Sequence, residues 1–278
     1  MQQNEIVHII NKFFQRLGKL LNQIENDFDE DSIHDFRKEV KKLRAFLRLI
    51  SLNRGIPDDL KLPHKLKKIY LLAGKIRDLQ LHLHFINDKY TEEDKPSEYL
   101  LLLQNEMEKW IKKLQIVLKE NQLLKIEKKI TGNLPEQVRM ETIKEFFQKK
   151  IMNIDALQSA RKVTDEDLHS IRKNIKDINY DLKILNDNDG ISIPFLLWDN
   201  EEIKKAENMA QELGLYNDIR TALLFMQPAY LNKINESERK RLQAIRKQWS
   251  LEKKSTKQNI SEKLRHLFLK ATNKEIFD

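Results

Sequence analysis

The chain has 278 residues, no cysteine and a formal net charge of +8 at pH 7. Because cysteine is absent, disulfides, thiolate catalysis and zinc or iron–sulfur centres held by cysteine are excluded. No uninterrupted apolar run reaches the roughly 20 residues of a membrane span, and the first residues lack the basic and apolar regions of a signal peptide. We therefore expect a cytoplasmic protein without membrane contact, whose basic balance favours a polyanionic partner.

The residue pattern along the chain is that of helices. Only 6 glycines and 6 prolines interrupt a sequence rich in Leu, Lys, Glu and Gln, which are good helix formers. Apolar residues recur three and four positions apart, and no alternating strand pattern extends beyond a few residues. The sequence therefore predicts an all-α fold with eight helices, at about residues 3–26, 32–53, 63–90, 97–130, 136–162, 165–186, 197–226 and 236–271.

The strongest break in this pattern lies near the middle of the chain, around Gly132 and Pro135, which are residues that end helices. Four predicted helices lie on each side of the break. We expect a single domain over residues 1–278, built from two repeat halves at about 1–133 and 134–278.

Two of the predicted helices begin at recognisable capping residues. Ser32 with Asp35 resembles a capping box, and Thr164 with Asp165 is the predicted cap of the sixth helix. These two helices also carry the most unusual charge pattern in the sequence.

The helix beginning near Ser32 has an apolar face and a basic face. At about 100° per residue, the apolar stripe consists of Ile33, Phe36, Val40, Leu43, Leu47 and Ile50. The neighbouring face carries cations and no acid: His34, Arg37, Lys38, Lys41, Arg44 and Arg48. A solvated helix face usually mixes charges, because Glu and Lys four apart support each other. Like charges at this spacing cost stability unless an anion lies against them, so this face is a candidate anion-binding surface.

The same pattern returns in the second half of the chain. His169 follows His34 by 135 positions, and at the same offset Arg172, Lys173, Lys176 and Lys183 repeat cations of the first copy. Two substitutions make the second copy less basic: Lys42 is replaced by Asp177 and Arg44 by Asn179. We expect the first copy to hold an anion more strongly than the second.

A second motif is repeated one helix further along. Gly74 and Asp78 in the third helix are matched by Gly214 and Asp218 in the seventh. Glycine inside a helix costs about 1 kcal/mol relative to alanine, so close helix–helix approach is the expected reason for each glycine. For the aspartates we expect a structural role, in which each carboxylate orients an Arg or His by a charge-assisted hydrogen bond. Two motifs repeated in the same order indicate an internal duplication.

If the halves pack about a pseudo-two-fold axis, the two basic faces can line a shared groove or channel. Arg donates to phosphate oxygens in pairs and Lys acts as a point charge, so such a groove suits a long polyanion. The alternative for each helix is a solvated basic flank with no ligand.

The two histidines leave an enzymatic alternative open. His34 or His169 could accept a phosphoryl group or bind a metal, but neither has a second histidine at helical spacing. The sequence has no P-loop and no Rossmann glycine pattern, and it shows no nucleophile paired with a base. We therefore expect a non-enzymatic protein without a metal or cofactor, and nucleic-acid binding through the same phosphate contacts remains a further alternative.

At these residues the sequence resembles the CHAD family, the conserved histidine α-helical domain. The resemblance rests on His-x-x-Arg-x-x-x-Lys in both basic helices, and on a Gly followed by an Asp one helix later. It covers essentially the whole chain, which looks like the standalone form of the domain. The positions that carry the four motifs are His34, Arg37, Lys41, Lys42, Leu43, Arg44, Gly74, Arg77, Asp78, His169, Arg172, Lys176, Tyr180, Gly214 and Asp218.

The resemblance implies two four-helix bundles around a basic central channel that binds inorganic polyphosphate. Some members of the family associate with polyphosphate granules, and the resemblance implies the same association here. The residues expected to contact the polymer are His34, Arg37, Lys38, Lys41, Arg44, Arg48, Arg77, His169, Arg172, Lys173, Lys176 and Lys183.

Overall fold

The computed structural model describes residues 1–52, 60–120, 122–160, 163–187 and 200–273. The regular elements in these ranges are helices. They are α1 (Gln3–Asp27), α2 (Glu30–Ile50), α3 (His64–Asn87), α4 (Ser97–Leu118), α5 (Leu123–Thr131), α6 (Met140–Gln158), α7 (Asp165–Asp187), α8 (Asn200–Phe225), α9 (Pro228–Leu231) and α10 (Glu236–Asn273), with a 3-10 turn at Glu92–Asp94. The predicted all-α class is therefore confirmed for the described residues. The predicted end of the second helix near residue 53 and the predicted start of the seventh near residue 197 lie outside them.

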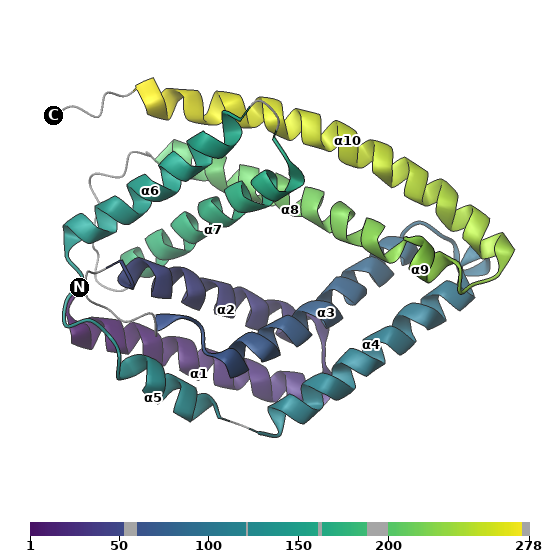
Figure 1. Ribbon diagram of the computed structural model, residues 1–278. Coiled ribbons are helices and arrows are strands. Elements are labelled where there is room, and N and C mark those ends of the chain that lie inside the picture. Colours follow the sequence, from purple (N-terminus) through teal and green to yellow (C-terminus); the bar gives the residue numbers. More distant parts are fainter. Residues whose placement is uncertain (53–59, 121, 161–162, 188–199, 274–278) are drawn as a thin grey trace.

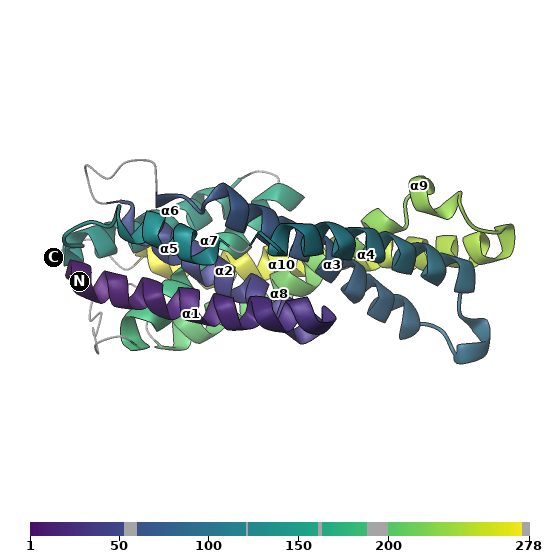
Figure 2. The same cartoon turned by 90° about the horizontal axis from the view of Figure 1, so that it is seen from below.

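The helices lie in two groups that follow the order of the chain. In Figure 1, α1 to α5 form the lower part of the molecule, and α6 to α10 form the upper part. In the first group α1 packs on α2, α2 on α3 and α3 on α4; in the second α6 packs on α7, α7 on α8 and α8 on α10. The groups meet where α2 packs on α7 and α3 on α8. Figure 2 shows that the whole body is flat and elongated.

One predicted helix is divided in the structure. The expected helix at 97–130 is wrong as a single element, because α4 ends at Leu118 and α5 starts at Leu123. The separate helix α5 packs against α1 and buries Ile126 and Ile130. No glycine or proline marks this turn, so the sequence pattern gave no sign of it.

The helix after the central break starts later than predicted. Residues 136–138 do not begin α6; they pair with the first residues of the chain instead. The Gln3 amide donates to the Glu136 carbonyl at 2.8 Å, and the Val138 amide donates to the Met1 carbonyl at 2.9 Å. These backbone bonds occupy groups that a helix would need, so α6 begins only at Met140.

The starts of α2 and α7 differ in how well the sequence predicted them. The cap of α2 is Asp29, whose carboxylate accepts a bond from the Ser32 amide at 2.8 Å. The predicted start at Ser32 is therefore wrong by about one helical turn. At α7 the prediction is confirmed: the Asp167 amide donates to Thr164 Oγ1 at 3.1 Å, and the Thr164 amide donates to the Asp167 carboxylate at 2.8 Å.

The core extends across both groups of helices and fixes the orientation of α2 and α7. A large apolar cluster takes residues from both groups, and a second cluster joins the far ends of α3, α4, α8 and α10. The predicted apolar stripe of α2 is buried in the large cluster, as are Ile171, Ile175 and Ile178 of α7. Burying these stripes turns the neighbouring basic faces toward the contact between α2 and α7. None of the described helices is long and apolar enough to cross a membrane.

Candidate anion-binding site

The basic faces of α2 and α7 lie against the same pocket. This pocket, which we call the central groove, has a volume of about 160 Å³. Helix α3 supplies one lining residue, and α2 and α7 supply the others. They are Lys41, Arg44, Arg48, Tyr70, His169, Arg172, Lys173, Lys176, Asp177 and Tyr180. Seven of the twelve residues expected to contact a polyanion are thus brought together here.

The groove adjoins a set of charged residues supplied by both copies of the motifs. We call Arg37, Lys41, Asp78, Arg172, Lys176 and Asp218 the central cluster. Burial, together with the nearby charges of Arg37, Arg172 and Lys176, lowers the pKa of Lys41 to about 7. The cations of the two copies therefore repel one another, in addition to the repulsion between Arg37 and Lys41 along α2 that the sequence indicated.

The lysines of α7 show the same effect. Burial and the charge of Arg172 lower the pKa of Lys176 to about 8. Burial lowers the pKa of Lys173 too, and Arg48 of α2 adds to the shift. An anion that enters this group of desolvated, crowded cations stabilises it, because each positive charge then acquires a partner at low dielectric.

The two motif aspartates lie among these cations. Burial raises the pKa of Asp78, and Arg37 and Lys75 oppose the shift. Burial also raises the pKa of Asp218, where Arg172 opposes the shift and Asp78 adds to it. The carboxylates therefore interact electrostatically with each other and with the motif arginines, and the expected orienting hydrogen bond to an Arg or His stays a prediction.

Arg37 explains the glycine in the third helix. Its Nη1 donates to the Tyr70 carbonyl at 3.1 Å, and its Cζ lies 4.9 Å from the centre of the Tyr70 ring. A Cβ atom on Gly74 would overlap the Arg37 guanidinium. The atoms nearest to this Cβ all belong to the Arg37 side chain. The glycine thus makes room for an arginine, and not for the close helix–helix approach that the sequence predicted.

The corresponding contact in the second half is looser. A Cβ atom on Gly214 would lie 3.5 Å from Arg172 Nη2, which is an ordinary van der Waals distance. Arg172 lines the central groove, and its Nε has no hydrogen-bond partner among the described residues. Arg37 is held by α3, whereas Arg172 keeps donor capacity for a ligand.

The histidines occupy different positions relative to the groove. His169 lines it, and His34 lies near Arg77, Lys38 and Lys41 without lining it. Burial lowers the pKa of both imidazoles, and neighbouring cations add to the effect. Within the described part of the chain, no cluster of three or more His, Cys, Asp or Glu side chains is placed to hold a metal.

Other predicted residues lie away from the central groove. Arg77 Nη1 forms an ion pair with Glu30 at 2.9 Å, at the start of α2. Lys183 lines a separate pocket of about 140 Å³ together with Arg16 and Lys42. Arg37 and Lys38 also do not line the groove, and Lys38 acts on His34 and Lys176 through its charge.

Asp177 does more than remove a cation from the second copy. It is buried, and its Oδ2 accepts from Arg48 Nη1 of α2 at 2.6 Å and from Lys150 Nζ of α6 at 2.7 Å. Asp177 therefore ties the two groups of helices together. Sequence reasoning missed this role, together with Lys150 and Tyr70, because their positions depend on tertiary packing.

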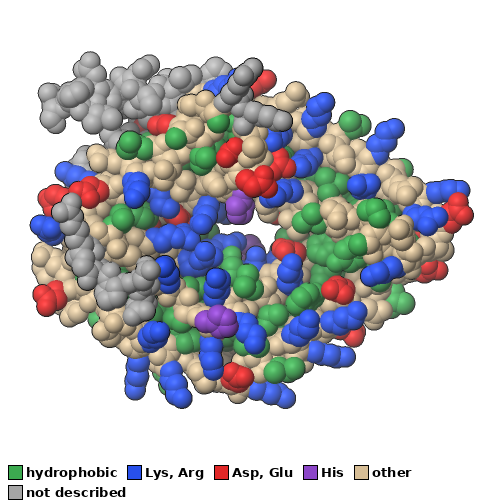
Figure 3. All heavy atoms as spheres, in the orientation of Figure 1, with side chains coloured by type: hydrophobic (Ala, Val, Ile, Leu, Met, Phe, Trp, Pro, Cys, Tyr) green, Lys and Arg blue, Asp and Glu red, His purple; other side chains and the backbone are tan. Residues whose placement is uncertain are grey.

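The space-filling view shows how these charges are distributed. In Figure 3 an opening passes through the middle of the molecule, and Lys and Arg side chains gather on its left side, over α2 and α7. Histidine and acidic side chains lie at other points of its rim. The most concentrated positive charge in this view thus faces the centre of the molecule.

Taken together, the fold and site define an all-helical protein in which two basic helices line one groove. The sequence model of the CHAD domain matches residues 8–227, so the chain belongs to the CHAD family. Among solved structures, the chain is similar to the crystal structure of the CHAD domain from the plant Ricinus communis, with a TM-score of 0.74 and 15% identity. The match covers 96% of this chain and 91% of that one, and at this identity it shows the fold alone. No curated protein matched the chain.

Proposed function

We propose that the protein binds inorganic polyphosphate without turning it over. The observation that carries the proposal is the convergence of both basic faces on the central groove, where Lys41 and Lys176 already have lowered pKa values. A polyanion would relieve this repulsion, and counterions released from the polymer would add to the affinity. CHAD membership is consistent with this ligand class.

An internal pseudo-two-fold repeat would explain the composition of the site. The two groups of helices pack in the same order, and each group supplies an Arg, a Lys and an Asp from equivalent motif positions to the central cluster. In this proposal the opening in Figure 3 is the basic channel, and the polymer runs along its α2–α7 side.

Binding of long-chain polyphosphate at increasing salt concentration tests the proposal. The logarithm of the association constant should fall linearly with the logarithm of the salt concentration, because phosphate contacts release counterions. Arg172→Ala should weaken binding and reduce the salt slope by about one. Arg37→Ala should also weaken binding. A folded protein, checked by circular dichroism, that ignores the polymer at low salt would contradict the proposal.

Two further measurements on the same samples distinguish polyphosphate binding from the two alternatives, an enzyme of phosphate chemistry and a nucleic-acid-binding protein. No orthophosphate should be released from the polymer, and release abolished by His34→Ala or His169→Ala would establish an enzyme instead. Long-chain polyphosphate should displace a nucleic acid of equal charge, since the desolvated lysines favour the denser charge. Equal competition would indicate a general phosphate-backbone binder.

A further inference from the structure

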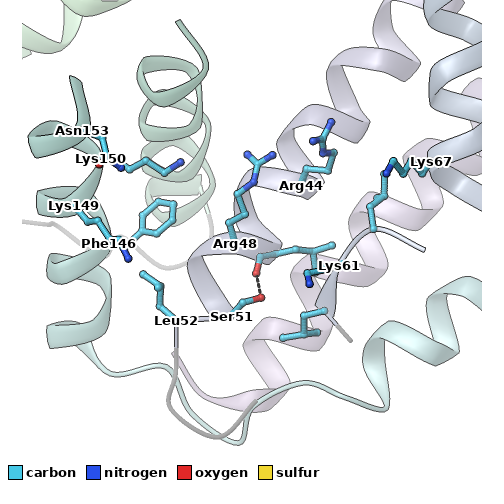
Figure 4. Close-up of a pocket in the computed structure, with 13 residues that line it drawn as sticks. Arg44, Arg48, Ser51, Leu52, Lys61, Lys67, Phe146, Lys149, Lys150 and Asn153 are labelled. Atoms are coloured by element: carbon cyan, nitrogen blue, oxygen red, sulfur yellow. Dashed lines mark hydrogen bonds between the residues drawn. The ribbon is translucent and has the colours of Figure 1, made fainter. Parts of the chain in front are cut away.

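A larger pocket adjoins the central groove on the side of α6. It has a volume of about 560 Å³, within the roughly 300–1,000 Å³ of small-molecule sites. The pocket lies between the end of α2, residues 60–62 with the first turn of α3, and α6 (Figure 4). We call it the lateral pocket. Its lining residues are Arg44, Leu47, Arg48, Ser51, Leu52, Leu60, Lys61, Leu62, Lys67, Phe146, Lys149, Lys150 and Asn153.

Among the described residues that line the lateral pocket, the charged side chains are all cationic. None of its described lining residues is acidic. Arg48 and Lys150 point toward one another across the pocket (Figure 4), and both form ion pairs with Asp177. Arg44, Lys67 and Lys149 form no ion pair with any residue in the described part of the chain. The pocket therefore has unused positive charge at its rim.

The wall of the lateral pocket is mainly apolar. It is formed by Leu47, Leu52, Leu60, Leu62 and Phe146. The centre of the Phe146 ring lies 5.2 Å from Lys150 Nζ. Leu52 is 37% exposed, which leaves apolar surface facing the pocket. A bare phosphate chain cannot bury such a surface, but a ligand with a planar apolar body can. Asn153 adds an amide with both donor and acceptor atoms for the polar edge of that body.

We propose that the lateral pocket binds an organic polyphosphate of the nucleoside triphosphate type. Its phosphates contact Arg44 and Arg48, and its aromatic base lies against Phe146 and Leu52. This inference rests on the proposed function, because Arg44 and Arg48 also line the central groove. The nucleotide and the end of a polyphosphate chain therefore compete for the same two arginines.

The probes that test this are adenosine triphosphate and inorganic tripolyphosphate, titrated calorimetrically into the full chain. They have the same number of phosphates, and only the nucleotide has an apolar body. We expect the nucleotide to bind several-fold more tightly. Equal or weaker binding of the nucleotide would overturn the proposal, whatever long-chain polyphosphate does.

Leu52→Asn separates the two sites. It should weaken nucleotide binding roughly threefold to tenfold and leave long-chain polyphosphate binding within about twofold of the unsubstituted protein. Leu251→Asn on α10 is the matched control, since Leu251 is 63% exposed and lies outside the pocket. Loss of affinity for both ligands in Leu52→Asn, or for neither, would overturn the lateral site. Nucleotide binding without polyphosphate binding would overturn the proposed function and leave the lateral site standing.

Discussion

The two basic helices differ in ways that their shared motif conceals. The basic face of α2 carries more cations than that of α7. Helix α7 nevertheless supplies more of the residues that line the central groove, six against three from α2 and one from α3. Arg37 is held by Tyr70 against Gly74, whereas Arg172 faces the groove. The two equivalent arginines therefore have different surroundings. Arg37 is fixed against α3, and Arg172 is presented to the groove.

The largest expected difference between the copies is at Lys42 and Asp177. Asp177→Ala leaves Arg48 and Lys150 without their shared buried carboxylate, which should lower the free energy of unfolding by about 2–4 kcal/mol. Lys42→Ala removes one partner of Glu39, which keeps Arg16, and should cost at most about 1 kcal/mol. Urea denaturation measures both. Equal losses would mean that Asp177 does not join the two halves.

The next difference concerns affinity at Arg44 and Asn179, the other pair of unlike equivalents. Arg44 lines both pockets, and a charge-assisted hydrogen bond contributes about 1.5–3 kcal/mol. Arg44→Ala should therefore weaken polyphosphate binding by about tenfold or more. Asn179→Ala should leave it unchanged, because Asn179 does not line the groove. If Asn179→Ala weakened polyphosphate binding as much as Arg44→Ala, the prediction that the first copy holds the anion more strongly would be contradicted.

A smaller effect is expected on the stability of the free protein. The pKa of Lys41 is about 7 in the folded chain, against an ordinary value of 10.5. Between pH 7 and pH 10.5 the unfolded state therefore binds more protons than the folded state. The amount by which Lys41 destabilises the fold decreases as the pH rises through this range. At pH 7 and below, most of that cost is present. Lys41→Met should raise the melting temperature by about 2–4 °C near pH 6–7 and raise it less near pH 10, while weakening polyphosphate binding.

Lys19→Met, at an exposed lysine of α1, is the control for the loss of one positive charge. It should change neither the melting temperature nor its dependence on pH. A Lys41→Met protein that melts at the same temperature as the parent at pH 6 would show that this lysine is not crowded.

The smallest expected effect lies at the two glycines. Gly74→Ala displaces the Arg37 guanidinium from Tyr70 and should weaken polyphosphate binding a few-fold, because Arg37 loses the contact that fixes its position in the central cluster. Gly214→Ala meets only ordinary contacts, so it should leave binding unchanged and raise stability by up to about 1 kcal/mol through helix propensity. Binding titrations and thermal melts check both. Equal effects of the two variants on binding and on stability would contradict the difference between the surroundings of Arg37 and Arg172.

The sequence allowed the helices, the buried stripe of α2 and most of the groove to be predicted. Lys41 and Lys176 were found because a charge pattern that is unfavourable on one helix recurs on another. The turn after Leu118 was missed, because no residue there forbids a helix and the packing of α5 on α1 decides the outcome.

The predictions that were wrong at the site concern residues whose roles depend on contacts between segments far apart in the sequence. Asp177 was read as a lost cation, and only the packing of α2, α6 and α7 brings Arg48 and Lys150 to it. Arg77 belongs to a motif, yet Glu30 reaches it from the preceding helix. A one-dimensional pattern identifies which face is basic, but it does not show which acids lie opposite.

The lowered pKa values of the groove lysines predict that the proposed polyanion binding consumes protons. In the free protein near pH 8, Lys41 and Lys176 are partly neutral, with pKa values of about 7 and about 8. A polyanion in the groove raises both pKa values, so each binding event takes up protons from the solution. The heat of binding at pH 8 should therefore depend on the ionisation enthalpy of the buffer, and this dependence should be weaker at pH 6, where both lysines already carry their protons.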